Sequence, residues 1–123
     1  MPVLIIHQTD KDVLDVLNLI FKIEGFEVHP FNGYPVGLAS YIHYVKADLV
    51  VLDYYMNGTE CKSLLNEIRA AGEDLPVIVA GCSSSIQKFS TDYGFTDYIE
   101  MPFEVAYFYE KVVSCLAHKA LHH

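Results

Sequence analysis

A run of branched apolar residues that ends on a carboxylate constrains this chain more than any other stretch. Residues 47–53 read Ala-Asp-Leu-Val-Val-Leu-Asp, and the apolar run is unbroken from Leu49 to Leu52. Such a run is typical of a strand buried on both faces, as in the middle of a parallel sheet. Open α/β sheets place their ligand crevice at the carboxyl ends of the strands. The pattern therefore indicates a functional role for Asp53, although an aspartate in this place also often only caps the loop after the strand.

Short apolar runs alternate with helical patterns along the whole chain. Strands are expected at residues 3–6, 26–29, 47–53, 75–80 and 97–100, and a helical pattern follows each of them. Parallel neighbours need crossover connections, so the alternation predicts an α/β, doubly wound domain with a five-stranded parallel sheet and helices on both faces. The length of 123 residues fits one domain over residues 1–123, with a tail at 118–123 that is expected to fray.

The first helix has recognisable start and stop signals. Thr9 with Asp12 three residues later resembles a capping box, and Gly25 stands where helices commonly end. The apolar residues expected on its buried face are Val13, Val16, Leu17, Ile20 and Ile23.

Charge and cysteine usage exclude several classes of function. The net charge is −8, with 16 acidic and 8 basic residues, which disfavours nucleic-acid phosphates and anionic membrane surfaces as partners. Cys61, Cys82 and Cys115 are widely spaced and form no CxxC pair, which favours free thiols in a reducing cytoplasm over disulfides or a zinc site. Cys82 is interpreted as a small buried apolar residue. No segment approaches the ~20 apolar residues of a membrane span.

Four segments resemble the receiver domains of response regulators in two-component signalling. Residues 94–103 read Gly-Phe-Thr-Asp-Tyr-Ile-Glu-Met-Pro-Phe and are similar to the family's G-A-D-D-Y-L-x-K-P-F segment. Residues 49–53 resemble its phosphoacceptor strand, residues 75–79 its fourth strand, and residues 20–28 its passage from first helix to second strand. The resemblance covers nearly the whole chain and implies a flavodoxin-like sheet in the order 2-1-3-4-5.

The same resemblance assigns positions to the site residues and shows where they depart from the family. It places Asp53 at the phosphoacceptor and Tyr98 at the aromatic switch. The family has an acidic, Mg²⁺-binding pair after the first strand, a Thr or Ser after the fourth, and a Lys before Pro-Phe. The corresponding residues here are His7 and Gln8, Gly81, and Met101.

These departures remove most of the groups that phosphoryl transfer requires. Magnesium sites rely on more than one carboxylate, and here only Asp53 and the carbonyl of Tyr55 remain. Catalysis of phosphoryl transfer is mostly positioning and charge neutralisation. We therefore expect no metal, no cofactor, weak or absent Mg²⁺ binding and no enzymatic activity. Ser83 or Ser84 could replace the missing hydroxyl only if the loop folded back.

His7 has two interpretations. If it lies beside Asp53, as the resemblance implies, a protonated imidazole could replace the missing metal charge and raise its own pKa. The other interpretation is a neutral imidazole with a backbone partner. We expect the charge pair. The terminal histidines His118, His122 and His123 are interpreted as part of the frayed tail rather than as a metal site.

Tyrosines gather toward the end of the chain. They are Tyr93, Tyr98, Tyr107 and Tyr109, and in receivers this region docks partners or forms a dimer. Interfaces favour aromatic residues, although ordinary packing also explains some of them. The expected partners are proteins: a histidine kinase, an output domain or a second copy of the chain.

The sequence thus predicts a degenerate receiver that acts through protein contacts without Mg²⁺-dependent phosphorylation. One alternative is a conventional phosphoacceptor at Asp53 with an improvised pocket. Another is a flavodoxin-like domain that binds a small cofactor at the same crevice. A Gly-rich phosphate loop after the first strand, which would favour the cofactor, is missing; Gln8 and Thr9 stand there instead.

Overall fold

The computed structural model describes residues 1–102 and 104–121, without the side chains of residue 56 and residues 119–121. Its strands form one parallel sheet in the order β2-β1-β3-β4-β5, which confirms the predicted topology. The strands are β1 (Val3–His7), β2 (Glu27–Phe31), β3 (Leu49–Asp53), β4 (Val77–Gly81) and β5 (Asp97–Glu100). The helices are α1 (Lys11–Ile23), α2 (Leu38–Val45), α3 (Thr59–Ala70), α4 (Ile86–Tyr93) and α5 (Val105–Leu121), with a 3-10 turn at Met56–Gly58.

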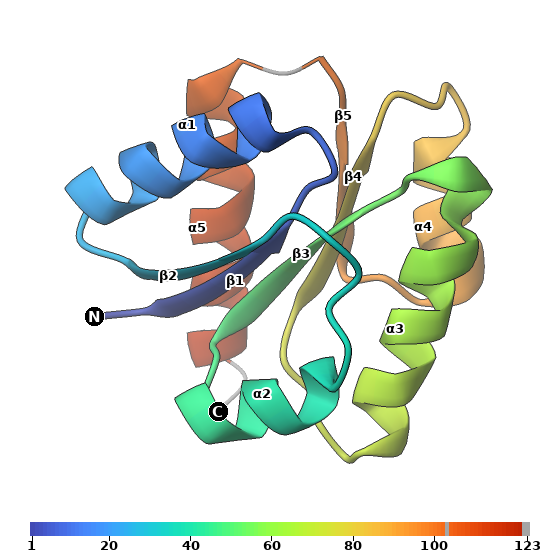
Figure 1. Ribbon diagram of the computed structural model, residues 1–123, viewed down its shortest axis with the longest axis horizontal. Coiled ribbons are helices and arrows are strands. Elements are labelled where there is room, and N and C mark those ends of the chain that lie inside the picture. Colours follow the sequence, from blue (N-terminus) through green and yellow to red (C-terminus); the bar gives the residue numbers. More distant parts are fainter. Residues whose placement is uncertain (103, 122–123) are drawn as a thin grey trace.

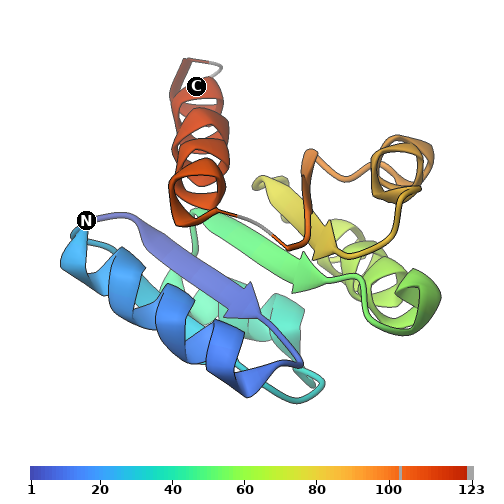
Figure 2. The same ribbon diagram turned by 90° about the horizontal axis from the view of Figure 1, so that it is seen from above.

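The sheet lies between two helical layers. In Figure 1, α1 and α5 lie on one side of the sheet and α3 and α4 on the other; Figure 2 shows the same layers from above. Each layer packs on its own apolar cluster, one through α1 and α5 and the other through α2, α3 and α4. Val51 belongs to the first cluster and Leu52 to the second, so β3 is buried on both faces as its unbroken apolar run predicts.

The edge strand β2 carries a proline without losing its pairing. The N–H of Glu27 donates to Pro2 and the carbonyl of Phe31 accepts from Gln8, so alternate residues of β2 face β1. Pro30 falls on the outward positions between them, where no N–H is needed for the sheet.

Helix α1 differs from its expectation at the cap and on the buried face. Its N-cap is Asp10, whose carboxylate accepts the N–H groups of Asp12 and Val13, and the cap assigned to Thr9 is wrong. The buried residues are Leu14, Leu17 and Phe21, whereas Val16 is 50% and Ile23 73% exposed. Both sets of apolar residues have helical spacing, so the spacing alone does not determine which of them packs on the sheet.

Two smaller expectations concern the tail and a cysteine. Helix α5 extends through Leu121, into the tail 118–123 that is expected to fray; the fraying stays a prediction, and residues 122 and 123 lie outside the described part of the chain. Cys61 and Cys115 are buried, but Cys82 is exposed, because β4 ends at Gly81 and the next residue already belongs to the loop. Within the described residues, no helix is both long and apolar enough to cross a membrane.

Candidate functional site

The carboxyl ends of the strands enclose a cavity of about 440 Å³ around Asp53. Because parallel strands end at the same edge of the sheet, residues far apart in sequence meet there. Of the residues singled out in the sequence, Gln8, Asp53, Tyr55, Gly81, Ser83 and Met101 line this cavity. His7 does not; it lines a neighbouring cavity.

Three local donors bind the carboxylate of Asp53. Its Oδ2 accepts the backbone N–H of Thr9 at 2.8 Å and the hydroxyl of the same residue at 2.7 Å. Its Oδ1 accepts the N–H of Tyr55 at 3.2 Å. Both carboxylate oxygens are therefore engaged within the chain. The sequence interpretation missed Thr9 because it assigned this residue to the helix cap, which Asp10 fills.

His7 is buried, and within the described residues no ion pair joins it to the carboxylate of Asp53, so the expected charge pair is wrong. It is 1% exposed, and burial lowers the pKa of the imidazole, which the charges of Asp53 and Glu60 offset only in part. Its Nδ1 lies 3.5 Å from the backbone N of Asp53 and is the acceptor of that long contact. The partner of the ring is thus the backbone of Asp53, not its carboxylate.

Strand alternation explains why the two side chains diverge. Ile5 belongs to the cluster under α2, α3 and α4, whereas Val51 belongs to the cluster under α1 and α5. His7 is two residues after Ile5, and Asp53 is two residues after Val51. Side chains two residues apart share a face, so His7 and Asp53 leave the sheet on opposite faces.

Gln8 places a neutral amide in the cavity. The residue is 3% exposed, and its Nε2 has no hydrogen-bond partner among the described residues. A buried amide donor without a partner is costly, so this group marks a place where an acceptor would be favourable.

Tyr54 fills the space beside Gly81. A Cβ added at Gly81 would overlap the Cβ of Tyr54 and lie 3.1 Å from its Cγ. The Tyr54 ring packs edge-on against Phe89 of α4, with 4.8 Å between the ring centroids. A Cβ added at Gly58, which has φ +78°, would overlap Phe89 and lie 2.9 Å from Cε2 of Tyr54. The Tyr54 side chain therefore lies against both glycines, through its Cβ at Gly81 and, together with Phe89, through its ring at Gly58. The sequence interpretation did not identify this role of Tyr54.

Ser83 and Met101 complete the cavity without replacing the missing groups. The Ser83 hydroxyl pairs with that of Ser85 at 2.8 Å and also accepts the N–H of Ser85. Met101 packs against the apolar cluster under α1 and α5. Among the described residues, no group of three His, Cys, Asp or Glu side chains could hold a metal ion.

The four tyrosines of the expected partner face do not lie together. Lys111 lies over the rings of Tyr98 and Tyr107, at 4.6 and 5.7 Å from their centroids, and it pairs with Asp97 at 2.8 Å. These contacts join Tyr98 and Tyr107 on β5 and α5. Tyr93 lies under Lys62 of α3 at 4.2 Å instead.

Tyr109 belongs to the core rather than to a docking surface. Its ring stacks on Phe21 with a centroid distance of 5.8 Å and meets Phe26 edge-on. It is also partly buried against the cluster under α1 and α5. Placing Tyr109 with Tyr107 is therefore wrong, because residues two apart on a helix do not share a face.

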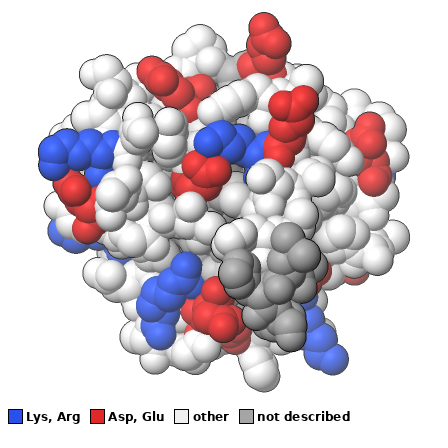
Figure 3. Space-filling view, turned by 180° about the vertical axis from the view of Figure 1, so that it is seen from behind, with Lys and Arg blue, Asp and Glu red and all other residues white. Residues whose placement is uncertain are grey.

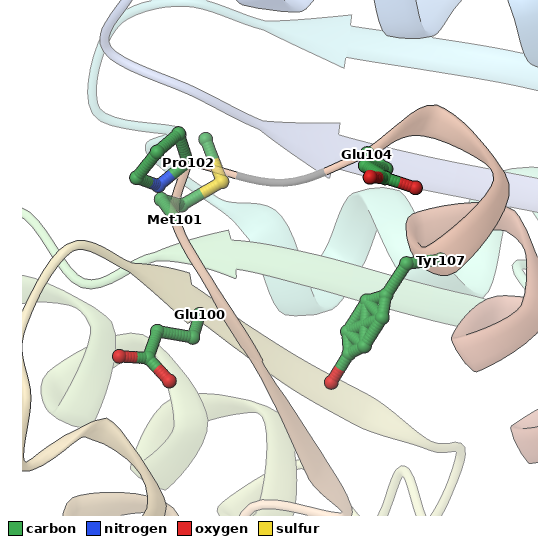
Figure 4. A pocket seen from close by; sticks show the side chains of 5 residues that line it. All are labelled: Glu100, Met101, Pro102, Glu104 and Tyr107. Atoms are coloured by element: carbon green, nitrogen blue, oxygen red, sulfur yellow. The ribbon is translucent and has the colours of Figure 1, made fainter.

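The surface beside Tyr107 is hollowed and acidic. A cavity of about 460 Å³ is lined by Glu100, Met101, Pro102, Glu104 and Tyr107, and Figure 4 shows the Tyr107 ring reaching from α5 toward β5. Figure 3 shows the side of the molecule opposite to Figure 1, where basic side chains stand singly or in small groups among acidic and uncharged ones. No broad basic patch suited to a phosphate backbone is visible on that side.

The relatives of this chain among known proteins include two transcriptional regulatory proteins. The chain is 35% identical over 88 residues to the transcriptional regulatory protein MalR of Bacillus subtilis, which is 68% of this chain and 36% of that protein. It is 28% identical over 117 residues to the transcriptional regulatory protein PrrA of Mycobacterium leprae, which is 94% of this chain and 50% of that protein. The chain thus spans half or less of the length of these relatives.

Solved structures agree on the fold. A CheY-like response regulator receiver domain protein from Methanospirillum hungatei superposes with a TM-score of 0.85 at 23% identity, over 100% of this chain and 99% of that one. No family model matches the sequence.

Proposed function

We propose that this chain, a receiver domain of the response-regulator class by fold and by sequence, serves two-component signalling through protein contacts and without Mg²⁺-dependent phosphorylation of Asp53. It would act in the cytoplasm as a signalling module rather than as an enzyme. The observation that carries the proposal is the carboxylate of Asp53, which accepts hydrogen bonds from Thr9 and Tyr55 on both oxygens.

The donor set around Asp53 does not fit Mg²⁺. This ion prefers octahedral oxygen ligands and binds through carboxylates together with water. Gln8 supplies a neutral amide in place of a carboxylate, and His7 leaves the sheet on the other face, where burial lowers the pKa of its imidazole. Met101 adds no charge. A metal at this position would rely on Asp53 and Asp10, and Asp10 already caps α1.

The space beside Gly81 also disfavours phosphoryl binding. In the resembling family a Thr or Ser hydroxyl occupies this position, and here the Tyr54 side chain takes the corresponding volume. Ser83 lines the cavity, but its hydroxyl is engaged with Ser85. Like charges at ~4 Å cost about 4 kcal/mol at an effective dielectric near 20, and the described cavity lining offers no cation against that cost.

The surface around Tyr98 and Tyr107 is the candidate docking surface. Tyr107 is 37% exposed and borders the acidic cavity of Figure 4. Exposed aromatic residues beside a hollow are typical of interfaces. A histidine kinase, an output domain or a second copy of the chain remains the proposed kind of partner.

Incubation with acetyl phosphate and Mg²⁺, followed by intact-mass measurement, tests the proposal. We expect no added phosphate on the wild-type chain. A mass gain of one phosphate that is absent in Asp53→Ala would overturn the proposal and favour the conventional phosphoacceptor. The absorbance spectrum of the purified protein tests the flavodoxin-like alternative, because a bound flavin would colour it.

A further inference from the structure

A second cavity, of about 480 Å³, adjoins the Asp53 site and plays no part in the function proposed above. Its walls come from the loops after β1, β2 and β3 and from the first turn of α3. The side chains that matter for its chemistry are His7, Asp10, Tyr34, Tyr55 and Glu60. Its volume lies within the range of about 300–1,000 Å³ that is usual for small-molecule sites.

His7 lies in the wall of this cavity and carries a buried polar atom without a partner among the described residues. The residue is 1% exposed, and its Nε2 has no hydrogen-bond partner among the described residues. When the ring is neutral and Nδ1 accepts from the N–H of Asp53 at 3.5 Å, the ring proton lies on Nε2. Burying an N–H without an acceptor is unfavourable. A ligand with an acceptor oxygen would remove that cost.

The remaining polar groups of the cavity favour a cation. Glu60 and Asp10 each bring a carboxylate, and neither has a salt-bridge partner in the described part of the chain. Because Oδ1 of Asp10 caps α1, Glu60 is the main carboxylate of the site. Tyr34 is 42% and Tyr55 45% exposed, so both rings are accessible. Aromatic faces and carboxylates together attract ammonium groups and repel anions.

We propose that this cavity binds a small cation of one chemical class: a protonated amine that carries a hydroxyl or carbonyl oxygen close to its nitrogen. The ammonium lies against Glu60, Asp10 and the tyrosine rings. The oxygen accepts the N–H of His7 Nε2. The carboxylates of Glu60 and Asp10 repel an anion. A plain alkylamine has no oxygen to accept the N–H of His7, so this donor stays unpaired.

The cavity is also connected to Asp53. Thr9 and Tyr55 line it, and both donate hydrogen bonds to the Asp53 carboxylate. A ligand that contacts these two residues therefore changes the surroundings of Asp53 without touching it. The binding itself does not depend on whether Asp53 is phosphorylated, so the two proposals fail separately.

The test is an NMR titration of the isotope-labelled chain with matched small molecules. Ethanolamine and glycinamide carry both groups, propylamine lacks the oxygen, and glycolate lacks the amine. We expect a Kd of about 1 mM for the first two, as suits ligands of this size. Propylamine should bind about tenfold more weakly, because it leaves the buried donor unpaired, and glycolate should not bind. The His7 Nε2–H resonance should shift with ethanolamine.

The free amino terminus of a polypeptide presents the same chemistry, so the panel includes triglycine amide and its N-acetylated form. If triglycine amide binds and the acetylated form does not, the site also accepts a chain terminus. If only the small amines bind, the ligand is a free metabolite-sized amine. Either result supports the proposed class of ligand.

Substitutions in the cavity wall test whether the amine binds in this cavity. Glu60→Gln should weaken ethanolamine binding at least about fivefold, because a desolvated charge pair is lost. Glu67→Gln on the same helix lies outside the cavity and should bind as the wild type does. His7→Phe should abolish the preference for ethanolamine over propylamine. Equal binding of these two amines to the wild type, an unchanged affinity in Glu60→Gln, or no binding of any amine would overturn the proposal; these outcomes stand even if His7→Phe does not fold.

Discussion

Thr9 holds one oxygen of the Asp53 carboxylate twice, through its backbone N–H at 2.8 Å and its hydroxyl at 2.7 Å. Thr9 lies in the loop after β1, and Asp53 is the last residue of the neighbouring strand β3, which ends at the same edge of the sheet. This pairing ties the loop after β1 to the end of β3. It also explains how an aspartate with no metal and no cationic neighbour in the described cavity lining is stabilised there.

The hydroxyl of Thr9 should contribute measurably to stability. Thr9→Val removes this donor at nearly constant volume and keeps the backbone donor, so the free energy of unfolding should fall by about 1 kcal/mol. Urea denaturation measures the change. Thr9→Ser keeps the hydroxyl and is the matched control. Equal stabilities of the Val and Ser variants would show that the side-chain hydrogen bond contributes nothing.

Gly81 should tolerate no side chain while Tyr54 is present. Gly81→Ala should lower the free energy of unfolding by about 1–3 kcal/mol, because the added methyl overlaps Tyr54. Gly33 has nothing within 4 Å of an added Cβ and no positive φ, so Gly33→Ala should cost little. In a double-mutant cycle, Gly81→Ala with Tyr54→Gly, which also removes the overlapped Cβ of Tyr54, should be less damaging than the sum of the two. Strict additivity would contradict the proposed contact.

These contacts show which parts of the site the sequence can predict. Gln8, Asp53, Gly81 and Met101 meet as expected, because parallel strands fix which residues share the carboxyl edge. The direction of a side chain at that edge is harder to predict. His7 ends β1 at the expected edge, but its side chain lies on the other face of the sheet, where burial lowers the pKa of the imidazole.

The remaining differences have local causes. Thr9 and Asp10 are both good N-cap residues, and the sequence alone does not decide which of the two caps α1. The role of Tyr54 depends on the absence of side chains at Gly58 and Gly81, two positions far apart in sequence. The sequence therefore predicts the fold and the membership of the site, whereas the hydrogen bonds of Asp53 require the structure.

Stability should fall as His7 becomes protonated at low pH. Burial lowers the pKa of His7 below its unfolded value of about 6.5, so the unfolded state binds the proton more readily. The contribution of the neutral ring is present above the unfolded pKa and is lost as the pH falls through the folded pKa. The free energy of unfolding should therefore decrease below about pH 6.5, by at most about 1.4 kcal/mol per pH unit from this group.

Comparison with His7→Asn isolates this effect from other titrating groups. Urea denaturation of both proteins at several pH values gives the difference in pH dependence. The wild type should lose more stability than the variant as the medium becomes acidic. A wild type that gains stability relative to His7→Asn on acidification would instead support a charge pair with Asp53.

Tyr107 and Tyr109 should behave differently when replaced. Tyr109→Ser removes a ring that stacks on Phe21, and the free energy of unfolding should fall by about 2–4 kcal/mol. Tyr107→Ser removes a partly exposed ring and should change the free energy of unfolding by about 0.5 kcal/mol or less.

If the chain self-associates through β5 and α5, light scattering should show the loss of the dimer in Tyr107→Ser. A dimer that persists in this variant would place the interface elsewhere.

Gln8→Asp alone should restore more Mg²⁺ binding than His7→Asp. Gln8 lines the cavity of Asp53, so a carboxylate there adds a second oxygen ligand on the correct face. A carboxylate at position 7 leaves the sheet on the opposite face and should add little.

Without metal, Gln8→Asp buries a charge near Asp53 and should lower the melting temperature. Millimolar Mg²⁺ should raise it again in Gln8→Asp, by mass action on the folded state, but not in the wild type or in His7→Asp. Thermal denaturation with Mg²⁺ or with EDTA measures this difference. A wild type that Mg²⁺ stabilises as strongly as Gln8→Asp would show that the donors around Asp53 already suffice for the metal.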